Sequence, residues 1–478
     1  MGLLILGISA GMAVLAYRLI VLAELNEVSA LPAAQKSNPI KIATRGSTIL
    51  VGSHLRGLVI LNNRAPVNTV VSLSSSNLAA VDLASQTVVI EKGQESTSFL
   101  YRGAGAGSSD LSARTDSFGS GSAHITATVA STPSTLRAAG SARDLLMGAA
   151  VSAGEFGYPS PLKAEPSYAA TLGQQYSMLE PENAMKWSVL HPTASQYDFR
   201  PGDDLVAFAQ AHNMKVRGHT LVWCHANPLW LDAYKQSSPA VVAQLLHEHI
   251  RSVMSHYKGK VFAWDVVNEA LQDNNSADDI RLKHCLWYDQ PGIGKAGTGA
   301  IEQAFRWAHE ADPEALLFYN EYDVLTPNGK FEAMYNMLAD FVRRRVPING
   351  VGLQMHLGTN GYPESSALER NIERLTELGL QVHITEVDVA VPVDSEGRAN
   401  AQDLKAQAET YHRILKICME NPKCTAFQTW GFSDKHSWVP KDKPGYGAAL
   451  PFDLEYKSKP AFSEMLDVLN GTEKASER

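Results

Sequence analysis

Apolar runs of strand length alternate with amphipathic segments beyond a Ser-, Thr-, Pro-, Ala- and Gly-rich stretch at 131–141. Eight such runs occur, at 145–150, 176–180, 215–223, 261–268, 316–320, 350–356, 381–389 and 425–432. One intervening segment has apolar positions at helical spacing, namely Leu404, Ala408, Tyr411, Ile414, Leu415 and Cys418. Continuous apolar strands alternating with helices are typical of a parallel sheet buried on both faces. Eight repeats predict an α/β fold, a closed (β/α)8 TIM barrel over residues 138–470.

The preceding region, residues 38–132, has a different pattern. It is rich in Ser, Thr, Val and Gly, with short extended runs at 48–51, 58–61, 69–73, 87–90, 96–101 and 124–129. Such runs separated by turn residues predict a small all-β sandwich, and the pattern resembles bacterial immunoglobulin-like modules. Its aromatic residues Phe99, Tyr101 and Phe118 could be sugar platforms or core. With so few of them, a spacer or stabilising role is favoured.

Residues 1–30 form an apolar N-terminal segment. The apolar run from Leu3 to Leu15 is interrupted by Arg18 and continues to Leu22, and Val28-Ser29-Ala30 offers a small-residue cleavage site. We interpret the segment as a signal peptide, with an uncleaved membrane anchor as the alternative. Both interpretations predict a secreted or extracytoplasmic protein.

Charge and cysteine content narrow the class of protein. The chain has 42 basic and 50 acidic residues, a formal net charge of -8, and no basic cluster that could follow a phosphate backbone, so nucleic acid is not an expected partner. Cys418 and Cys424 enclose five residues, a spacing that a disulfide can bridge in an oxidising compartment. Cys224 and Cys285 could pair or stay free.

Two glutamates end predicted barrel strands. The fourth run leads into Asn268-Glu269 and the seventh contains Thr385-Glu386. Barrel enzymes carry their reacting groups at such strand ends, although either carboxylate alone could be a salt-bridged structural residue. Two facing carboxylates can break an acetal, because one can protonate the leaving oxygen while the other attacks the anomeric carbon. The pair therefore predicts a glycoside hydrolase.

The motifs around these glutamates resemble those of glycoside hydrolase family 10, the barrel xylanases. Trp-Asp-Val-Val-Asn-Glu at 264–269 resembles the acid/base strand, and Ile-Thr-Glu-Val-Asp at 384–388 resembles the nucleophile strand. Further matching segments occur in the same order, at 182–187, 218–223, 352–356 and 429–438. The resemblance covers essentially all of residues 138–468. It implies cleavage of internal β-1,4-xylosidic bonds, with Glu269 as acid/base and Glu386 as nucleophile.

The resemblance also implies supporting roles, position by position. Asn268 is expected to bind the sugar 2-hydroxyl, and His356, with Asp388 behind it, to orient the nucleophile and keep it ionised. Substrate-binding residues are implied at Glu182, Asn183, Lys186, Trp187, His219, Trp223, Gln354, Asn320, Tyr322, Trp430 and Trp438. The last two would offer apolar faces to sugar rings, with packing at the rim as the alternative.

One segment departs from the family pattern. After Trp223 the family commonly continues with His-Ser-Gln, whereas this chain has Cys224-His225-Ala226. Two hypotheses arise: His225 takes over the sugar contact, or Cys224 forms a bridge to Cys285.

The expected mechanism is double displacement with net retention, acting on xylan or a xylo-oligosaccharide, in a monomer. The sequence has no closely spaced metal-ligand cluster and no Gly-rich phosphate loop followed by Lys, so neither a metal nor a cofactor is expected. Two alternatives stand beside a xylanase. One is a related barrel hydrolase acting on cellulose or another β-glycan, against which Trp438 is the candidate for steric closure. The other is a catalytically inactive glycan-binding protein.

Overall fold

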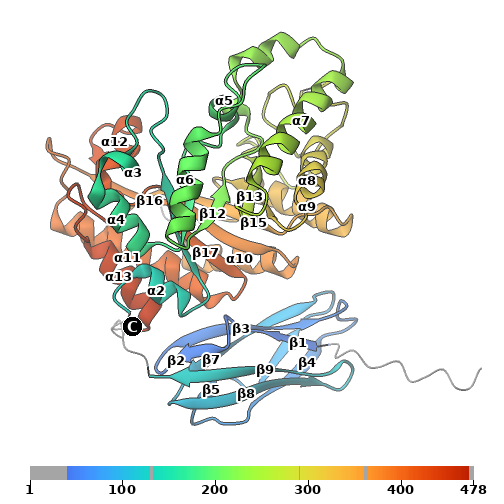
Figure 1. The fold of residues 1–478 in the computed structure, drawn as a ribbon. Coiled ribbons are helices and arrows are strands. Elements are labelled where there is room, and N and C mark those ends of the chain that lie inside the picture. The colour runs from blue at the N-terminus through green and yellow to red at the C-terminus, as the bar shows by residue number, and fades with distance from the viewer. Residues whose placement is uncertain (1–39, 130–132, 290, 360–363, 473–478) are drawn as a thin grey trace, which may run out of the picture.

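Eight parallel strands close into a barrel in the computed structural model of the chain (Figure 1). They are β10 (Leu146–Val151), β11 (Met178–Pro181), β12 (Lys215–Gly218), β13 (Ala263–Asn268), β14 (Leu316–Glu321), β15 (Gly350–Gly358), β16 (Gln381–Pro392) and β17 (Cys424–Thr429). Each strand pairs with the next in the chain, and β17 pairs with β10, which closes the cylinder. All eight predicted runs contribute a strand, so the predicted (β/α)8 fold is confirmed.

The structure describes residues 40–129, 133–289, 291–359 and 364–472. The predicted signal peptide or anchor at 1–30 lies outside these residues. Within the described part of the chain, none of the helices has the length and apolar character needed to cross a bilayer.

Helices surround the barrel strands. The longer ones are α4 (Pro166–Gln175), α6 (Arg200–Ala211), α7 (Pro239–Tyr257), α8 (Gly299–Ala311), α9 (Gly329–Arg343), α10 (Ser365–Glu377), α11 (Ala401–Glu420) and α13 (Pro460–Asn470). Shorter ones are α2 (Leu136–Ser141), α3 (Pro161–Ala164), α5 (Trp187–Leu190) and α12 (Val439–Asp442). In α11 the predicted apolar stripe is buried from Ala408 to Cys418, and the side chain of Asn400 accepts the Asp403 N–H to cap the first turn.

Four barrel strands end at least two residues from their predicted limits. β12 stops at Gly218 and β17 at Thr429, before the predicted 223 and 432. His219, which follows β12, has its imidazole Nδ1 3.0 Å from Asp265 Oδ2. β15 and β16 continue past 356 and 389 and pair with each other, and β16 then pairs with the short strand β18 (Tyr446–Gly447).

The region before the barrel is an all-β sandwich, as predicted. One sheet contains β1 (Ile40–Ala43), β3 (His54–Leu61), β5 (Val81–Leu83) and β7 (Ser96–Gly103). The other contains β2 (Thr48–Leu50), β4 (Thr69–Ser75), β6 (Thr87–Ile90), β8 (Gly107–Thr115) and β9 (Gly119–Thr128). Phe99 and Tyr101 are buried and Phe118 packs against the core, so the aromatic residues of this domain are used for packing.

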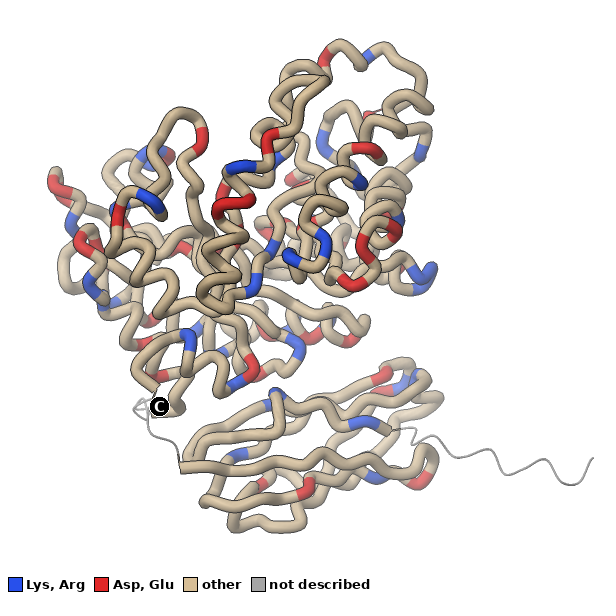
Figure 2. Tube along the Cα trace, viewed as in Figure 1, with Lys and Arg blue, Asp and Glu red and all other residues tan. Residues whose placement is uncertain are grey.

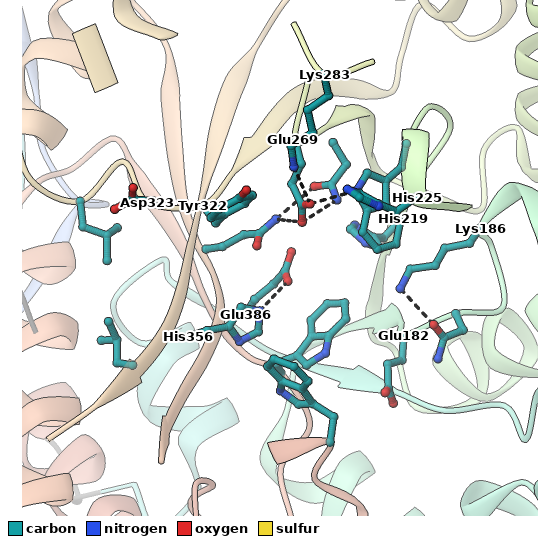
Figure 3. Close-up of a pocket in the computed structure, with 18 of the residues that line it drawn as sticks. Glu182, Lys186, His219, His225, Glu269, Lys283, Tyr322, Asp323, His356 and Glu386 are labelled. Atoms are coloured by element: carbon teal, nitrogen blue, oxygen red, sulfur yellow. Dashed lines mark hydrogen bonds and ion pairs between the residues drawn. The ribbon is translucent and has the colours of Figure 1, made fainter. Parts of the chain in front are cut away.

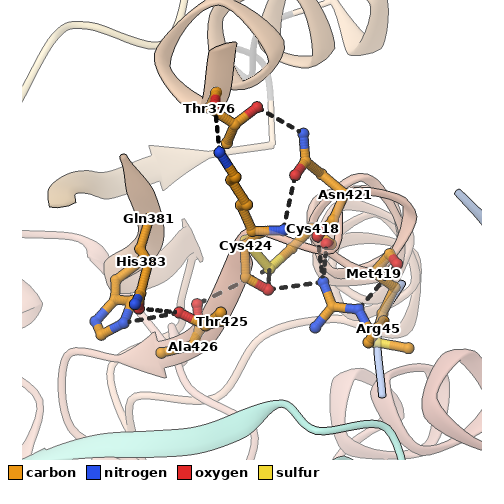
Figure 4. The surroundings of a disulfide bond; sticks show 11 residues. Arg45, Thr376, Gln381, His383, Cys418, Met419, Asn421, Cys424, Thr425 and Ala426 are labelled. Carbon is orange, nitrogen blue, oxygen red and sulfur yellow. Dashed lines mark hydrogen bonds between the residues drawn. A yellow bond between two sulfur atoms is a disulfide. The ribbon is translucent and has the colours of Figure 1, made fainter. Parts of the chain in front are cut away.

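Buried arginines join the two domains. Arg45, between β1 and β2, donates to the carbonyl oxygens of Cys418 (2.5 Å), Met419 (3.1 Å), Asn421 (2.6 Å) and Cys424 (2.7 Å), around the C-terminus of α11 (Figure 4). In the opposite direction, Arg143 of the barrel domain donates to the Ser53 hydroxyl at 2.6 Å. Figure 2 shows acidic and basic residues interspersed along the trace of both domains.

Candidate active site

Local backbone irregularities direct the two predicted glutamates. Glu269 directly follows β13 and Glu386 lies within β16, and both have left-handed backbone, with φ of 52° and 59°. The strand register shifts between Asp265 and Val267, just before Glu269, and between Ile384 and Val387, a span that contains Glu386. Bulges and left-handed residues re-aim side chains and occur often beside functional sites. The sheet geometry therefore turns both carboxylates toward the barrel mouth.

A cavity of about 850 Å³ opens at this mouth. In Figure 3 the carboxylates of Glu269 and Glu386 point toward each other across it. Other predicted site residues that line it are Glu182, Asn183, Lys186, His219, Trp223, Asn268, Tyr322, Gln354, His356, Trp430 and Trp438. The cavity wall also includes His225, Lys283, Asp323, Leu325, Thr326 and Leu357.

Hydrogen-bond donors surround the carboxylate of Glu269. Gln354 Nε2 lies 3.0 Å from Oε1, Trp223 Nε1 lies 3.0 Å from Oε2, and Asn268 Nδ2 lies 3.2 Å from Oε1. The Lys283 ammonium is 3.5 Å from Oε2. Burial acts to raise the pKa of Glu269, but the donors and the ammonium outweigh it and leave this pKa below its ordinary value. These partners therefore favour an ionised Glu269.

The carboxylate of Glu386 has a cationic partner. His356 Nε2 is 3.1 Å from its Oε2, while His356 Nδ1 is 2.8 Å from Asp388 Oδ2. Burial acts to lower the pKa of His356, but the two carboxylates overcome it and raise this pKa to about 10. The imidazolium can then donate a hydrogen bond to each of the two carboxylates. Trp438 Nε1 donates to the same Asp388 oxygen at 2.8 Å.

A buried amide connects the two halves of the site. Asn320 Nδ2 donates to Glu386 Oε1 at 2.7 Å and to Asn268 Oδ1 at 2.8 Å, and Asn268 in turn contacts Glu269. The Thr385 hydroxyl donates to Asn320 Oδ1 at 2.8 Å and fixes the orientation of the amide. Asn320 is fully buried and does not line the cavity, so the predicted substrate contact at Asn320 is corrected to a positioning role.

Trp187 also requires a correction. It begins α5, and its indole is buried between the rings of His249 and Trp287, at centroid distances of 3.6 Å and 4.8 Å. The residue before it, Lys186, faces the cavity, but it is the extended N-cap of α5, and the chain turns into the helix at Trp187. Trp187 therefore packs in the core and is not a sugar-binding residue.

Charged residues that the sequence analysis did not single out form the floor of the site. Arg217 contacts Asp265 and has its Nε 3.1 Å from Glu180 Oε2, and Gln428 Nε2 donates to the same Glu180 oxygen at 2.8 Å. These four residues lie inside predicted apolar strand runs, where a buried charge must be paired. A charged residue within an apolar run is therefore a sequence signal that could have identified the charged members of this group. Lys283 follows Glu269 in a loop, and no periodicity indicates it.

Glu180 is partly unsatisfied. Its Oε1 has no hydrogen-bond partner and lies 3.5 Å from His219 Nδ1, and burial raises the pKa of Glu180 to about 7. Ligand atoms of Glu180, His219 and Glu386 lie within 4.8 Å of one another, which is close enough to hold a metal ion. However, His219 is hydrogen-bonded to Asp265, and although burial lowers its pKa, the neighbouring carboxylates raise it overall. A protonated imidazole opposes a bound cation, so this cluster fits a metal poorly.

Both cysteine pairs are joined. Cys418 is bonded to Cys424, as predicted, and Cys224 to Cys285. The Cys224–Cys285 bond confirms one of the two hypotheses for the segment after Trp223, the one in which Cys224 is bridged to Cys285. His225 also lines the cavity, with its ring 5.6 Å from that of Trp223, so it is available for the contact that the other hypothesis assigns to it.

A (β/α)8 barrel whose mouth holds two facing glutamates, buried amides and indole rings defines a glycoside hydrolase. The chain belongs to glycosyl hydrolase family 10, whose sequence model matches residues 135–468. It is therefore an enzyme that hydrolyses glycosidic bonds, and the resemblance drawn from the motifs is confirmed.

Known relatives match the barrel. Endo-1,4-beta-xylanase B of Thermotoga neapolitana is 40% identical over 311 residues, which are 65% of this chain and 85% of the relative. The crystal structure of xylanase 10B from Thermotoga maritima has a TM-score of 0.64 at 38% identity, and the match covers 70% of this chain and 98% of that one. Xylanase 10B from Thermotoga petrophila RKU-1, solved in complex with xylobiose, has the same TM-score and identity, with coverage of 70% and 97%.

Proposed function

We propose that this enzyme is an endo-1,4-β-xylanase that cleaves internal bonds of xylan with retention of anomeric configuration. The observation that carries the proposal is the pair of carboxylates, Glu269 and Glu386, that face each other across one cavity (Figure 3). The similar proteins named as xylanases support the choice of xylan. The described chain carries the complete site, which supports a monomeric enzyme.

In the proposed reaction, Glu386 attacks the anomeric carbon and forms a covalent glycosyl-enzyme, while Glu269 donates its proton to the departing oxygen. Glu269 then removes a proton from the incoming water, which releases the sugar with retained configuration. His356 orients the nucleophile through its hydrogen bond to Glu386. Asn268 binds the sugar 2-hydroxyl, a hydrogen bond that strengthens as positive charge develops on the ring.

We propose that substrate binding raises the pKa of Glu269, as a general acid requires. Gln354 and Trp223 donate to its carboxylate and lower its pKa. A sugar that occupies the cavity offers these donors its own oxygens and excludes water from the carboxylate. Both changes raise the pKa of Glu269, so the acid becomes protonated in the enzyme–substrate complex.

Trp438 supports a preference for xylose over glucose. Its indole lines the cavity and is held in place by Asp388 and by the edge of the His356 ring, 5.0 Å away. Glucose carries a hydroxymethyl group that xylose lacks, and a fixed indole can exclude it, although discrimination at this scale is modest. We expect the reducing ends released from xylan to exceed those from carboxymethylcellulose, and we expect Trp438→Ala to narrow this difference.

Proton NMR of the first sugar released from a xylo-oligosaccharide tests substrate and stereochemistry together. A β-anomer is expected, and an initial α-anomer would contradict a retaining mechanism. Glu386→Ala should lose hydrolysis by at least about 10⁴-fold, whereas the exposed Glu396→Ala serves as a control with unchanged activity. Full activity of Glu386→Ala would contradict the assigned nucleophile.

We also propose an extracytoplasmic location. Two disulfide bonds, which persist in oxidising compartments, support it together with the apolar segment at 1–30. N-terminal sequencing of the mature protein distinguishes a cleaved signal peptide from an anchor, because cleavage after Ala30 yields Leu31 as the first residue.

A further inference from the structure

The loop between β10 and α3 carries two exposed aromatic side chains. Phe156 is 69% exposed and Tyr158 is 68% exposed, and they are the only aromatic residues among the exposed large apolar side chains of the described chain. In Figure 1 this loop projects from the end of the barrel at which the strands terminate. Exposed aromatic rings are unfavourable in water, and neither residue contributes to the described core.

The backbone beneath these rings is firmly built. A side chain at Gly154 would place its Cβ 2.3 Å from the Ser160 nitrogen, so the two ends of the loop touch. The Glu155 carboxylate accepts the Ser152 hydroxyl at 3.0 Å and the Ala153 N–H at 3.1 Å. Hydrogen bonds at the base therefore hold the loop, which presents its rings in a defined position.

Phe156 occupies an unfavourable backbone conformation. Its φ is 58°, that of Gly157 is 84°, and Tyr158 N–H closes the turn on Glu155 O at 3.2 Å. Glycine or asparagine suits such a left-handed position, whereas a bulky side chain is strained there. Neither local conformation nor burial explains a phenylalanine at this site. Strain of this kind is concentrated where a side chain has a function.

The loop begins beside the sugar-binding cavity. Val151, the last residue of β10, accepts the Glu182 N–H at 2.9 Å, and Glu182 lines the cavity. Figure 3 places Glu182 and Lys186 toward one end of this cavity and Tyr322 toward the other. β10 also pairs with β17, which leads into the cavity residue Trp430. The loop that carries the aromatic pair thus starts from a strand that borders the Glu182 end of the site.

We propose that Phe156 and Tyr158 form an additional sugar-binding subsite beyond the Glu182 end of the cavity, where a pyranose ring of a longer glycan stacks on their faces. The proposal rests on the proposed function. Aromatic rings bind the apolar faces of sugars, and in the proposed complex the glycan that fills the cavity extends onto the rings of Phe156 and Tyr158. A preorganised loop limits the entropy lost when the sugar binds.

Kinetics on xylohexaose and xylotriose test the subsite. The variant Phe156→Gly with Tyr158→Ala removes both rings while relieving the left-handed strain, so its folding should be intact by circular dichroism. We expect kcat/KM on xylohexaose to fall about tenfold through KM, with xylotriose unaffected. Phe156→Trp with Tyr158→Trp keeps two rings and should retain the wild-type kcat/KM on xylohexaose. As a control at another exposed apolar residue, Leu229→Ala should leave kcat/KM on both oligosaccharides unchanged.

The outcomes separate the two proposals. Equal kinetics of the ring-free variant and wild type on xylohexaose would overturn the subsite and leave the proposed function intact. An equal loss on both oligosaccharides would also overturn it, because the rings would then act on the cavity itself. Wild-type enzyme that cleaves neither oligosaccharide would overturn the proposed function, and the subsite with it.

Discussion

The two active-site glutamates differ in the charge of their hydrogen-bond partners. Glu386 has an imidazolium partner that is itself held by Asp388. Glu269 accepts hydrogen bonds from the neutral donors of Gln354 and Trp223, which a sugar can engage instead. Its ion-pair partner Lys283 is more distant, at 3.5 Å. This difference supports the proposed assignment of Glu269 as the acid and base and of Glu386 as the nucleophile.

The exchangeable donors predict a pH profile. The basic limb of kcat/KM reports the pKa of Glu269 in the free enzyme, which is low, and the basic limb of kcat reports it in the complex. We therefore expect the basic limb of kcat at higher pH than that of kcat/KM on xylohexaose. Gln354→Leu removes one donor and should move the kcat/KM limb toward higher pH. Coincident limbs in the wild type would contradict this account.

His356 predicts a pH-dependent stability. Its pKa is about 10 in the folded protein and about 6.5 in the unfolded chain, so between these values only the folded protein retains the proton. Its stabilising contribution is full below about pH 6.5 and is lost as the pH rises to about 10. The difference in unfolding free energy between wild type and His356→Gln should shrink by on the order of 3 kcal/mol over this range. Urea titrations at pH 6, 8 and 10 measure it, and a constant difference would refute the prediction.

At the level of elements, the strands were predictable because each is an apolar run buried on both faces. The residues at their ends were assigned through motifs, and motif position alone does not specify side-chain direction. Trp187 and Asn320 both lie in matching segments, yet one packs in the core and the other beneath the cavity. Lys283 reaches Glu269 from a loop without periodicity, so only the folded chain reveals it.

The two disulfides predict unequal contributions to stability. Cys224–Cys285 closes a loop with a sequence separation of 61, and Cys418–Cys424 one with a separation of 6. On loop-closure entropy, the longer bridge contributes about 4 kcal/mol and the shorter about 2 kcal/mol. Cys224→Ser with Cys285→Ser should therefore lower the denaturation midpoint more than Cys418→Ser with Cys424→Ser does. The reverse order would show that local packing at α11 outweighs chain entropy.

At the scale of the whole molecule, the sandwich supplies polar groups that the barrel lacks. Arg45 lies 2% exposed, and its guanidinium satisfies carbonyls at the end of α11, where a positive charge also suits the helix dipole. The aromatic residues of the sandwich are used for packing and not for sugar binding. The contact of Arg45 with the barrel is therefore the feature of this domain that stabilises the barrel. This favours the stabilising role predicted for the domain.

Arg45→Met should destabilise the protein by about 3 kcal/mol, because buried carbonyls lose a charged donor. Arg102 is a matched control in the same domain, since its side chain is 51% exposed in a surface pair with Asp82, and Arg102→Met should cost less than about 1 kcal/mol. Chemical denaturation of both variants provides the comparison. Equal effects would mean that the buried guanidinium adds nothing beyond a surface charge.

The arginine contact between sandwich and barrel has a consequence for heating the enzyme or shortening it. If one domain unfolded alone, either the guanidinium of Arg45 or its carbonyl acceptors would lose their hydrogen-bond partners. Differential scanning calorimetry should therefore record one unfolding transition rather than two. A barrel trimmed at residue 132 would expose bare acceptors beside the Cys418–Cys424 bond. An enzyme shortened to its barrel should therefore unfold at a lower temperature while it retains its hydrolytic activity.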